Sequence, residues 1–105
     1  IRTTPALALS VLAVAALAIA AYPNPANPRV TLRFTLPTAG AVRLALHDAR
    51  GRRVRTLLSA DLQAGEHAVR WDGRDDAGRV LPTGVYLYRL EDHAALATGR
   101  LTLLR

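Results

Sequence analysis

The amino-acid sequence predicts a small all-β protein, an antiparallel sandwich of about seven short strands. After residue 21, apolar and polar side chains alternate along several short runs, as in Val30–Leu36, and such alternation is typical of half-buried strands. Turn residues separate these runs at intervals of roughly 8–12 positions, which is the spacing of a sandwich. No run after residue 21 has the helical period.

Alternation places six of the strands. Their expected bounds are residues 30–36, 42–47, 53–58, 67–71, 85–90 and 100–104. The pattern is weakest in the third of these runs, because Leu57 and Leu58 are adjacent. The run 85–90 is rich in valine, tyrosine and leucine, which favour strands.

Turn residues mark the connections between these strands. Asp48 and Gly51 hold the first and last positions of a four-residue segment, as in a type I turn. The longest loop contains Asp72-Gly73 and Gly78, and its glycines tolerate the positive φ of tight turns. Gly84 closes this loop and opens the next strand.

The aromatic residues indicate where the core lies. Trp71 ends a strand on the face shared with His67, and a ring of that size fills the space between two sheets. Tyr86 and Tyr88 share one face of their strand, while the residues between and before them share the other. One of these two pairs is therefore expected in the core and the other at the surface.

Residues 6–21 are apolar except for Ser10. A helix of that length rises about 24 Å, less than the ~30 Å of a bilayer core. The run resembles the apolar region of a secretory signal peptide, with Arg2 before it and Ala18-Ile19-Ala20 as the cleavage site. A short membrane anchor and a buried helix are the alternatives. We therefore expect an N-terminal apolar helix within residues 1–21, a domain over residues 22–105, and a secreted or cell-surface location.

The composition excludes several kinds of chemistry and suggests one kind of partner. The chain has 14 Arg, no Lys, 8 acidic residues and no Cys, so disulfides, thiolate nucleophiles and cysteine zinc sites are excluded. A single basic face would attract an anionic surface glycan, whereas solvated strand edges are the plainer interpretation. No nucleic-acid partner is expected, because no RNA-binding aromatic pair or helix-turn-helix is present. The arginines expected on the basic face are Arg33, Arg43, Arg53, Arg55 and Arg70.

No catalytic, cofactor or metal site is expected. Asp72, Asp75 and Asp76 lie close together, but they lack the spacing and final glutamate of an EF-hand, so turn and capping roles are favoured. The three histidines are too widely spaced for a local zinc motif. Ser59 is the only serine after the apolar run and has no neighbouring base. The sequence thus predicts a protein that is not an enzyme.

A series of short motifs resembles a known family. The motifs follow one another in the order Tyr22-Pro23-Asn24-Pro25, Asp48 to Gly51, Trp71-Asp72-Gly73, Gly78, and Gly84-Val85-Tyr86-Leu87-Tyr88. This series is similar to the immunoglobulin-like domain named after the flagellar hook-capping protein FlgD, a module that overlaps with type IX secretion sorting domains. The resemblance covers residues 22–105.

The resemblance implies an Ig-like sandwich without a catalytic role. As a C-terminal domain of a secreted bacterial protein, it implies sorting or anchoring through the secretion or cell-surface attachment machinery. Contact with neighbouring domains of a larger protein, or a scaffold role as in the hook cap, is the alternative. The family commonly reads YPNPFNP, and Ala26 replaces the Phe here, so a looser entry into the first strand is expected. Arg105 is expected to make few contacts with the core, so that its removal leaves the sandwich intact.

Overall fold

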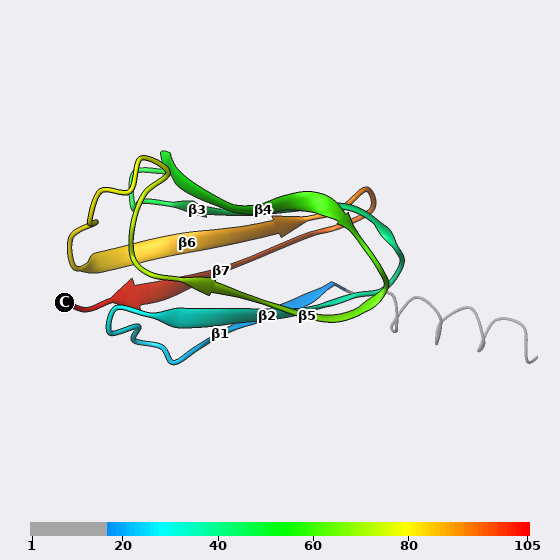
Figure 1. Cartoon of the computed structure of the whole chain (residues 1–105), viewed down its shortest axis with the longest axis horizontal. Coiled ribbons are helices and arrows are strands. Elements are labelled where there is room, and N and C mark those ends of the chain that lie inside the picture. Colours follow the sequence, from blue (N-terminus) through cyan, green and yellow to red (C-terminus); the bar gives the residue numbers. More distant parts are fainter. Residues whose placement is uncertain (1–16) are drawn as a thin grey trace, which may run out of the picture.

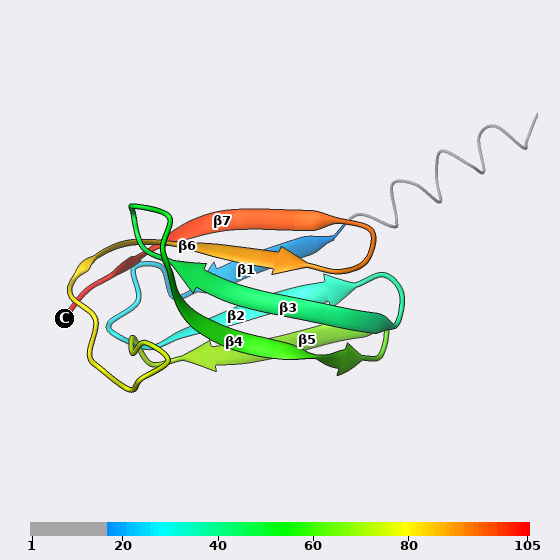
Figure 2. The same cartoon turned by 90° about the horizontal axis from the view of Figure 1, so that it is seen from above.

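The computed structural model describes residues 17–105, which form two layers of antiparallel strands (Figure 1). The strands are β1 (Ala18–Tyr22), β2 (Val30–Leu36), β3 (Gly40–His47), β4 (Arg53–Leu62), β5 (Gly65–Trp71), β6 (Gly84–Glu91) and β7 (Leu96–Leu103). One sheet has the order β1-β2-β5 and the other β4-β3-β6-β7, and Figure 2 shows them stacked. The predicted all-β sandwich is confirmed.

β1 is the strand that the sequence analysis missed. It pairs antiparallel with β2, with Ala18 opposite Thr35 and Tyr22 opposite Thr31. Ile19 and Ala21 pack against the core, while the alternate residues of the strand are exposed. The expectation that residues up to 21 lie outside the sandwich is therefore wrong for residues 17–21.

Most of the expected apolar helix falls on residues 1–16, outside the described residues. A signal peptide or an anchor there stays a prediction. From residue 17 onward the structure contains no helix that is long and apolar enough to cross a membrane.

The irregular third run of the sequence is explained by the pairing of β4 with β3. The register shifts between Leu44 and Ala45, so that Leu44 pairs with Leu58 and Ala45 with Thr56. Leu57 is left as the extra residue of a β-bulge. Leu57 and Leu58 both pack against the core, because the bulge breaks the alternation of faces.

The core lies between the two sheets and contains the expected aromatic residues. Trp71 is 1% exposed, and its ring meets the ring of Tyr86 edge-on at a centroid distance of 5.5 Å. Tyr86 and Tyr88 are buried, whereas Val85 is exposed on the opposite face. The tyrosine pair is thus the one that faces the core.

Gly99 gives Tyr88 its place in this core. The two residues are partners in the β6–β7 ladder. A Cβ atom at Gly99 would overlap the Tyr88 ring, so the ring occupies the space that any other residue would need. The sequence analysis did not single out this glycine.

Candidate functional site: a clasp on the C-terminal strand

The proline-rich segment before β2 holds the end of β7. β7 is the last strand of its sheet, so its outer edge has no neighbouring strand. The Asn24 side chain binds this edge twice: its Nδ2 donates to the carbonyl of Arg100 at 3.3 Å, and its Oδ1 accepts from the amide of Thr102 at 3.0 Å. Prolines on both sides keep the segment out of any regular ladder, because they lack amide donors.

Ala26 continues the same contact. Its amide donates to the carbonyl of Thr102 at 2.7 Å, and its carbonyl accepts from the amide of Leu104 at 2.7 Å. This forms an isolated parallel bridge to Leu103, and the Ala26 side chain is fully buried. The looser entry expected from the loss of the family's Phe is not observed at Ala26, because the backbone there is bonded on both sides.

Arg105 fixes the chain beyond β7. Its amide donates to Thr83 Oγ1 at 3.1 Å, and its guanidinium donates to the carbonyls of Gly73 and Leu81. The arginine thus joins the strand end to the loop between β5 and β6, through hydrogen bonds to that loop and not through the core. We use the name C-terminal clasp for Asn24, Ala26 and Arg105 with their partners on β7 and this loop.

Two loops at the same end of the sandwich share one architecture. Both have the sequence Asp-x-x-Gly-Arg, at residues 48–52 and 75–79. In each, the aspartate carbonyl accepts from the glycine amide at 2.9 Å, and Oδ1 accepts from the amides two and four residues later. In each, Oδ2 pairs with the arginine Nε, at 2.9 Å for Arg52 and 3.0 Å for Arg79. The predicted turn from Asp48 to Gly51 is confirmed.

These contacts lower the pKa of both aspartates below the ordinary value of 3.8. For Asp75 the leading cause is the hydrogen bond from the Arg79 amide, which outweighs the effect of desolvation. For Asp48 desolvation is the largest single influence and acts to raise the pKa. The hydrogen bonds from Arg52 and Arg50 together outweigh it, so the net direction is downward.

Acid is therefore expected to destabilise the domain through these two loops. Because the folded pKa values of Asp48 and Asp75 lie below the unfolded ones, the unfolded state binds more protons in this range. The stabilisation is complete above pH ~4 and is lost as the pH falls through the folded pKa values. Thermal unfolding followed by circular dichroism should show Tm falling below pH ~4, and the double variant Asp48→Asn, Asp75→Asn should show a weaker fall. An identical pH dependence in the variant would contradict this account.

The other two aspartates of the loop also have structural roles. Asp76 bonds the edge of β4, since its amide donates to the Val54 carbonyl at 3.0 Å and its Oδ1 accepts from the Thr56 amide at 3.0 Å. Asp72 Oδ1 accepts from the amide of Arg74 at 3.2 Å. No group of three or more acidic or histidine side chains arranged to hold a metal ion occurs among residues 17–105. All three carboxylates of the cluster thus bond backbone amides.

The buried aromatic pair is bonded to the same loop. Trp71 Nε1 donates to the carbonyl of Arg74 at 2.9 Å, and Tyr86 Oη donates to the carbonyl of Pro82 at 2.7 Å. A tyrosine hydroxyl bonded to the backbone a few residues upstream is a feature of Ig-like sandwiches. Burial, followed by the charge of Asp48, raises the pKa of Tyr86, so the hydroxyl stays protonated as a donor.

The expected basic face is corrected by the strand order. Arg33 and Arg70 lie on β2 and β5, in one sheet, whereas Arg43 and Arg53 lie on β3 and β4, in the other. Arg55 turns toward the loop, where its guanidinium donates to the carbonyl of Arg74 at 3.2 Å. The five arginines therefore do not share a face. The expectation failed because the sequence alone does not show which strands belong to which sheet.

The histidines and the serine are dispersed. His47 lies on β3 and His67 on β5, in different sheets, and Ser59 pairs with Arg43 across β4 and β3. His67 is partly buried; its ring stacks on Phe34, and its Nε2 lies 2.8 Å from the Gln63 carbonyl. His67 is therefore a partly buried ring with a hydrogen-bonding partner.

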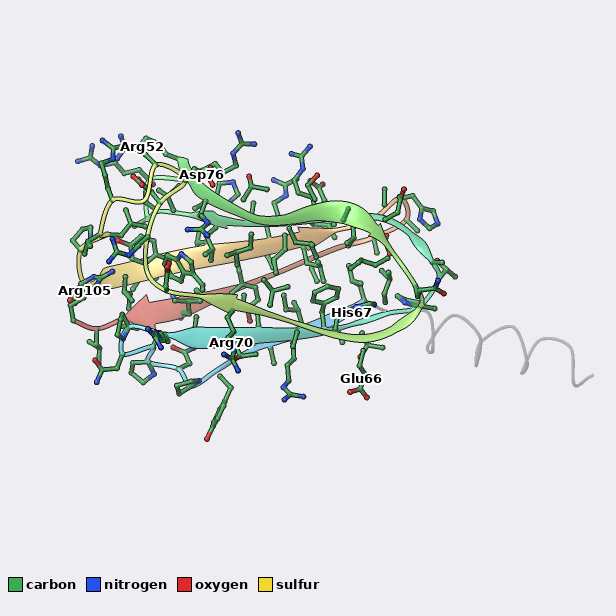
Figure 3. All side chains as sticks on the ribbon, viewed as in Figure 1. Arg52, Glu66, His67, Arg70, Asp76 and Arg105 are labelled. Atoms are coloured by element: carbon green, nitrogen blue, oxygen red, sulfur yellow. The ribbon has the colours of Figure 1, made fainter. Side chains whose placement is uncertain are left out.

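The structure brings most of the motif residues to one end of the sandwich, where the C-terminus lies; Figure 3 shows Arg52, Asp76 and Arg105 there. Asn24 belongs to the clasp, Asp48 and Gly51 to one loop, and Asp72, Gly73 and Gly78 to the other. Tyr22 is different, since its side chain is 77% exposed on the outer face of β1. Asn24 was expected as a motif residue, but its contacts with β7 were not. They could not be predicted from local sequence, because they join residues 76 and 78 positions apart.

The Ig-like sandwich agrees with the comparison to known families. The sequence profile of the FlgD Ig-like domain matches residues 26–95, and the chain belongs to this family. The basal-body rod modification protein FlgD of Salmonella typhimurium is 42% identical over 48 residues, which are 46% of this chain and 21% of that protein. The match thus spans about a fifth of its relative's length.

Solved structures share the fold. PorU from Porphyromonas gingivalis superposes with a TM-score of 0.67 at 19% identity over 82% of this chain and 9% of PorU. PorZ, a surface component of the type IX secretion system of the same organism, gives 0.54 at 21% over 83% and 11%. FlgD from Xanthomonas campestris, described in relation to hook capping, gives 0.53 at 26% over 89% and 73%.

Proposed function

We propose that this domain is a non-catalytic, extracytoplasmic module that serves as the C-terminal sorting or anchoring domain of a secreted bacterial protein. The observation that carries the proposal is the C-terminal strand. β7 is an edge strand, and the clasp bonds its edge only from Arg100 onward. From Leu96 to Thr98 this edge has no hydrogen-bonded neighbouring strand, and in this proposal an export or attachment component recognises it by adding a strand.

A further point supports an extracytoplasmic role. The family includes flagellar proteins, and the same fold occurs in PorZ, which is described as a bacterial surface component of the type IX secretion system.

A structural assembly module is the second candidate. The relatives with higher identity are FlgD proteins, from Salmonella at 42% over the matched segment and from Xanthomonas at 26% over most of the chain. In this role the domain binds neighbouring domains or subunits and carries no sorting signal.

A fusion experiment distinguishes the two candidates. Residues 17–105 are placed behind a signal peptide and a reporter in a host with type IX secretion. We expect the reporter on the cell surface, and we expect Thr98→Pro to abolish delivery. The amide of Thr102 faces away from β6, toward Asn24, and Thr98 lies four residues earlier in the same strand, so its amide also faces away from β6. Proline at position 98 therefore removes a donor from the outer edge of β7 and leaves the hydrogen bonds between β6 and β7 intact.

The matched control is Thr31→Pro, which removes an amide from β2, a strand paired on both sides, and is expected to unfold the domain. Circular dichroism of the Thr98→Pro protein must show an intact β-sandwich. A folded Thr98→Pro fusion that still reaches the surface would show that the edge of β7 is not the sorting signal. A folded wild-type fusion that stays inside, together with restored motility when residues 17–105 replace the Ig-like domain of Salmonella FlgD, would favour the assembly role.

A further inference from the structure

The outer face of the four-stranded sheet carries an excess of positive charge. Its residues are far apart in the sequence and lie together because their strands are neighbours in the sheet. His47 pairs with Arg53 on one side and Leu87 on the other, and Leu87 pairs with Arg100, so one row crosses all four strands. In the neighbouring rows, Arg89 pairs with Ala45 and Thr98, and Arg43 with Glu91. We call this surface the cationic face and define it by Arg43, His47, Arg53, Leu87, Arg89 and Arg100.

Most of its arginines have no carboxylate partner. Glu91 is the one acidic residue in these rows, and its Oε2 lies 3.8 Å from Arg89. Arg43, Arg53 and Arg100 are exposed and form no ion pair with any residue in the described part of the chain. Each retains free guanidinium donors, a planar fork that matches a carboxylate.

The loop arginines at the end of the sandwich differ from these. Arg52 and Arg79 are each held by the aspartate four residues before them. The outer face of the three-stranded sheet is also more balanced, since Arg33 and Arg70 share it with Glu66, which points away from the sandwich in Figure 3. The excess of positive charge is therefore larger on the cationic face than on the outer face of the three-stranded sheet.

The cationic face is hollowed and partly apolar. A hollow of about 480 Å³ has Leu87 beside His47, Arg89 and Arg100. A second hollow of about 300 Å³ is lined by Arg43, Arg53 and Arg89, and it shares His47, Gly51 and Arg89 with the first. Leu87 is 38% exposed and offers an aliphatic contact beside the guanidinium donors of the hollow.

This combination selects among polyanions. Single-stranded nucleic acids are held largely by aromatic stacking, whereas Tyr86 and Tyr88 of this sheet are both buried. An acidic glycan has no aliphatic side chain to place against Leu87, and a flat bilayer surface does not fill a hollow. An extended peptide does both, because every second side chain lies on the same face, so that a Glu-x-Leu-x-Glu segment places an aliphatic group between two carboxylates.

We propose that the cationic face binds an acidic, partly aliphatic peptide segment of a partner protein, with carboxylates on Arg89 and Arg100 and an aliphatic side chain against Leu87. This is an interaction surface separate from the edge of β7, so it stands whether the domain sorts or assembles. Its affinity rests partly on charge and should fall with ionic strength.

The test uses the 105-residue chain and a fluorescein-labelled peptide of repeating Glu-Ser-Leu-Ser, in which glutamate and leucine alternate along one face, read by fluorescence anisotropy. We expect saturable binding at low salt that weakens at least tenfold in the double variant Arg89→Gln, Arg100→Gln. The matched control is Arg33→Gln, Arg70→Gln, which removes the same charge from the opposite sheet and should change affinity less than twofold. Circular dichroism verifies that both variants fold.

Three outcomes would overturn the proposal. An equal loss of peptide affinity in the two double variants would mean that binding depends only on the net charge of the protein. Equal binding of a peptide with the same composition but all glutamates grouped together would remove the role of Leu87. Binding of dextran sulfate or of phosphatidylglycerol vesicles, without binding of the alternating peptide, would assign the face to a glycan or a lipid.

Discussion

Replacing Trp71 with Ala is expected to lower the free energy of unfolding by about 3–5 kcal/mol, as for large aromatic residues removed from a core. The indole is buried, packs edge-on against Tyr86, and donates to the carbonyl of Arg74 at 2.9 Å. The substitution therefore opens a cavity and also leaves a loop carbonyl without its donor. A loss of this size is a large share of the ~5–15 kcal/mol of a small domain.

Urea unfolding followed by circular dichroism measures the effect, since the single tryptophan is lost in the variant. Trp71→Phe is the matched control: it keeps an aromatic ring beside Tyr86 but not the Nε1–H donor to Arg74, and should cost less. A change below ~1 kcal/mol for Trp71→Ala would contradict the assignment of this ring as the main aromatic of the core.

Removing β1 is expected to have an effect of similar size. A chain that begins at Tyr22 loses the antiparallel ladder to β2 and the packing of Leu17, Ile19 and Ala21 against the core. Half-buried aliphatic side chains and a short ladder together are worth roughly 3–5 kcal/mol. The edge of β2 would also be open to pairing between chains.

Comparison of residues 17–105 with residues 22–105 by urea unfolding and by light scattering checks this. The longer chain should unfold cooperatively as a monomer, and the shorter one should be less stable and aggregate. Equal stability of the two would mean that β1 adds nothing to the sandwich, as the sequence analysis had expected of residues up to 21.

The strands after residue 30 could be predicted because alternation survives there. Phe34 and Leu36 follow the period of two and are buried in β2, as the pattern requires. β1 could not be separated from the apolar run before it, because alanine disfavours strands and every neighbour is also apolar. The side chains of β1 alternate between partly buried and exposed because only one face of the strand meets the core, and this contact exists only in the tertiary structure.

The candidate site was predictable only where its signals are local. The turn beginning at Asp48 was found from its residues, and the same Asp-x-x-Gly-Arg signal at Asp75 was present in the sequence but went unnoticed. The clasp on β7 depends on pairs far apart in the chain, such as Asn24 with Thr102. The cationic face depends on which strands are neighbours, so Arg89 and Arg100 were overlooked while Arg33 was assigned to the wrong group.

The central claim is that the lead-in segment closes over β7, so that the C-terminal strand is part of the fold and only its first half has an open edge. Site-resolved amide hydrogen exchange tests it on the 105-residue chain. The account predicts that the amides of Ala26, Thr102 and Leu104 are protected as strongly as those of β6, because each donates a hydrogen bond in the clasp. Exchange of these three amides at the rate of an unstructured peptide, while β6 stays protected, would contradict it.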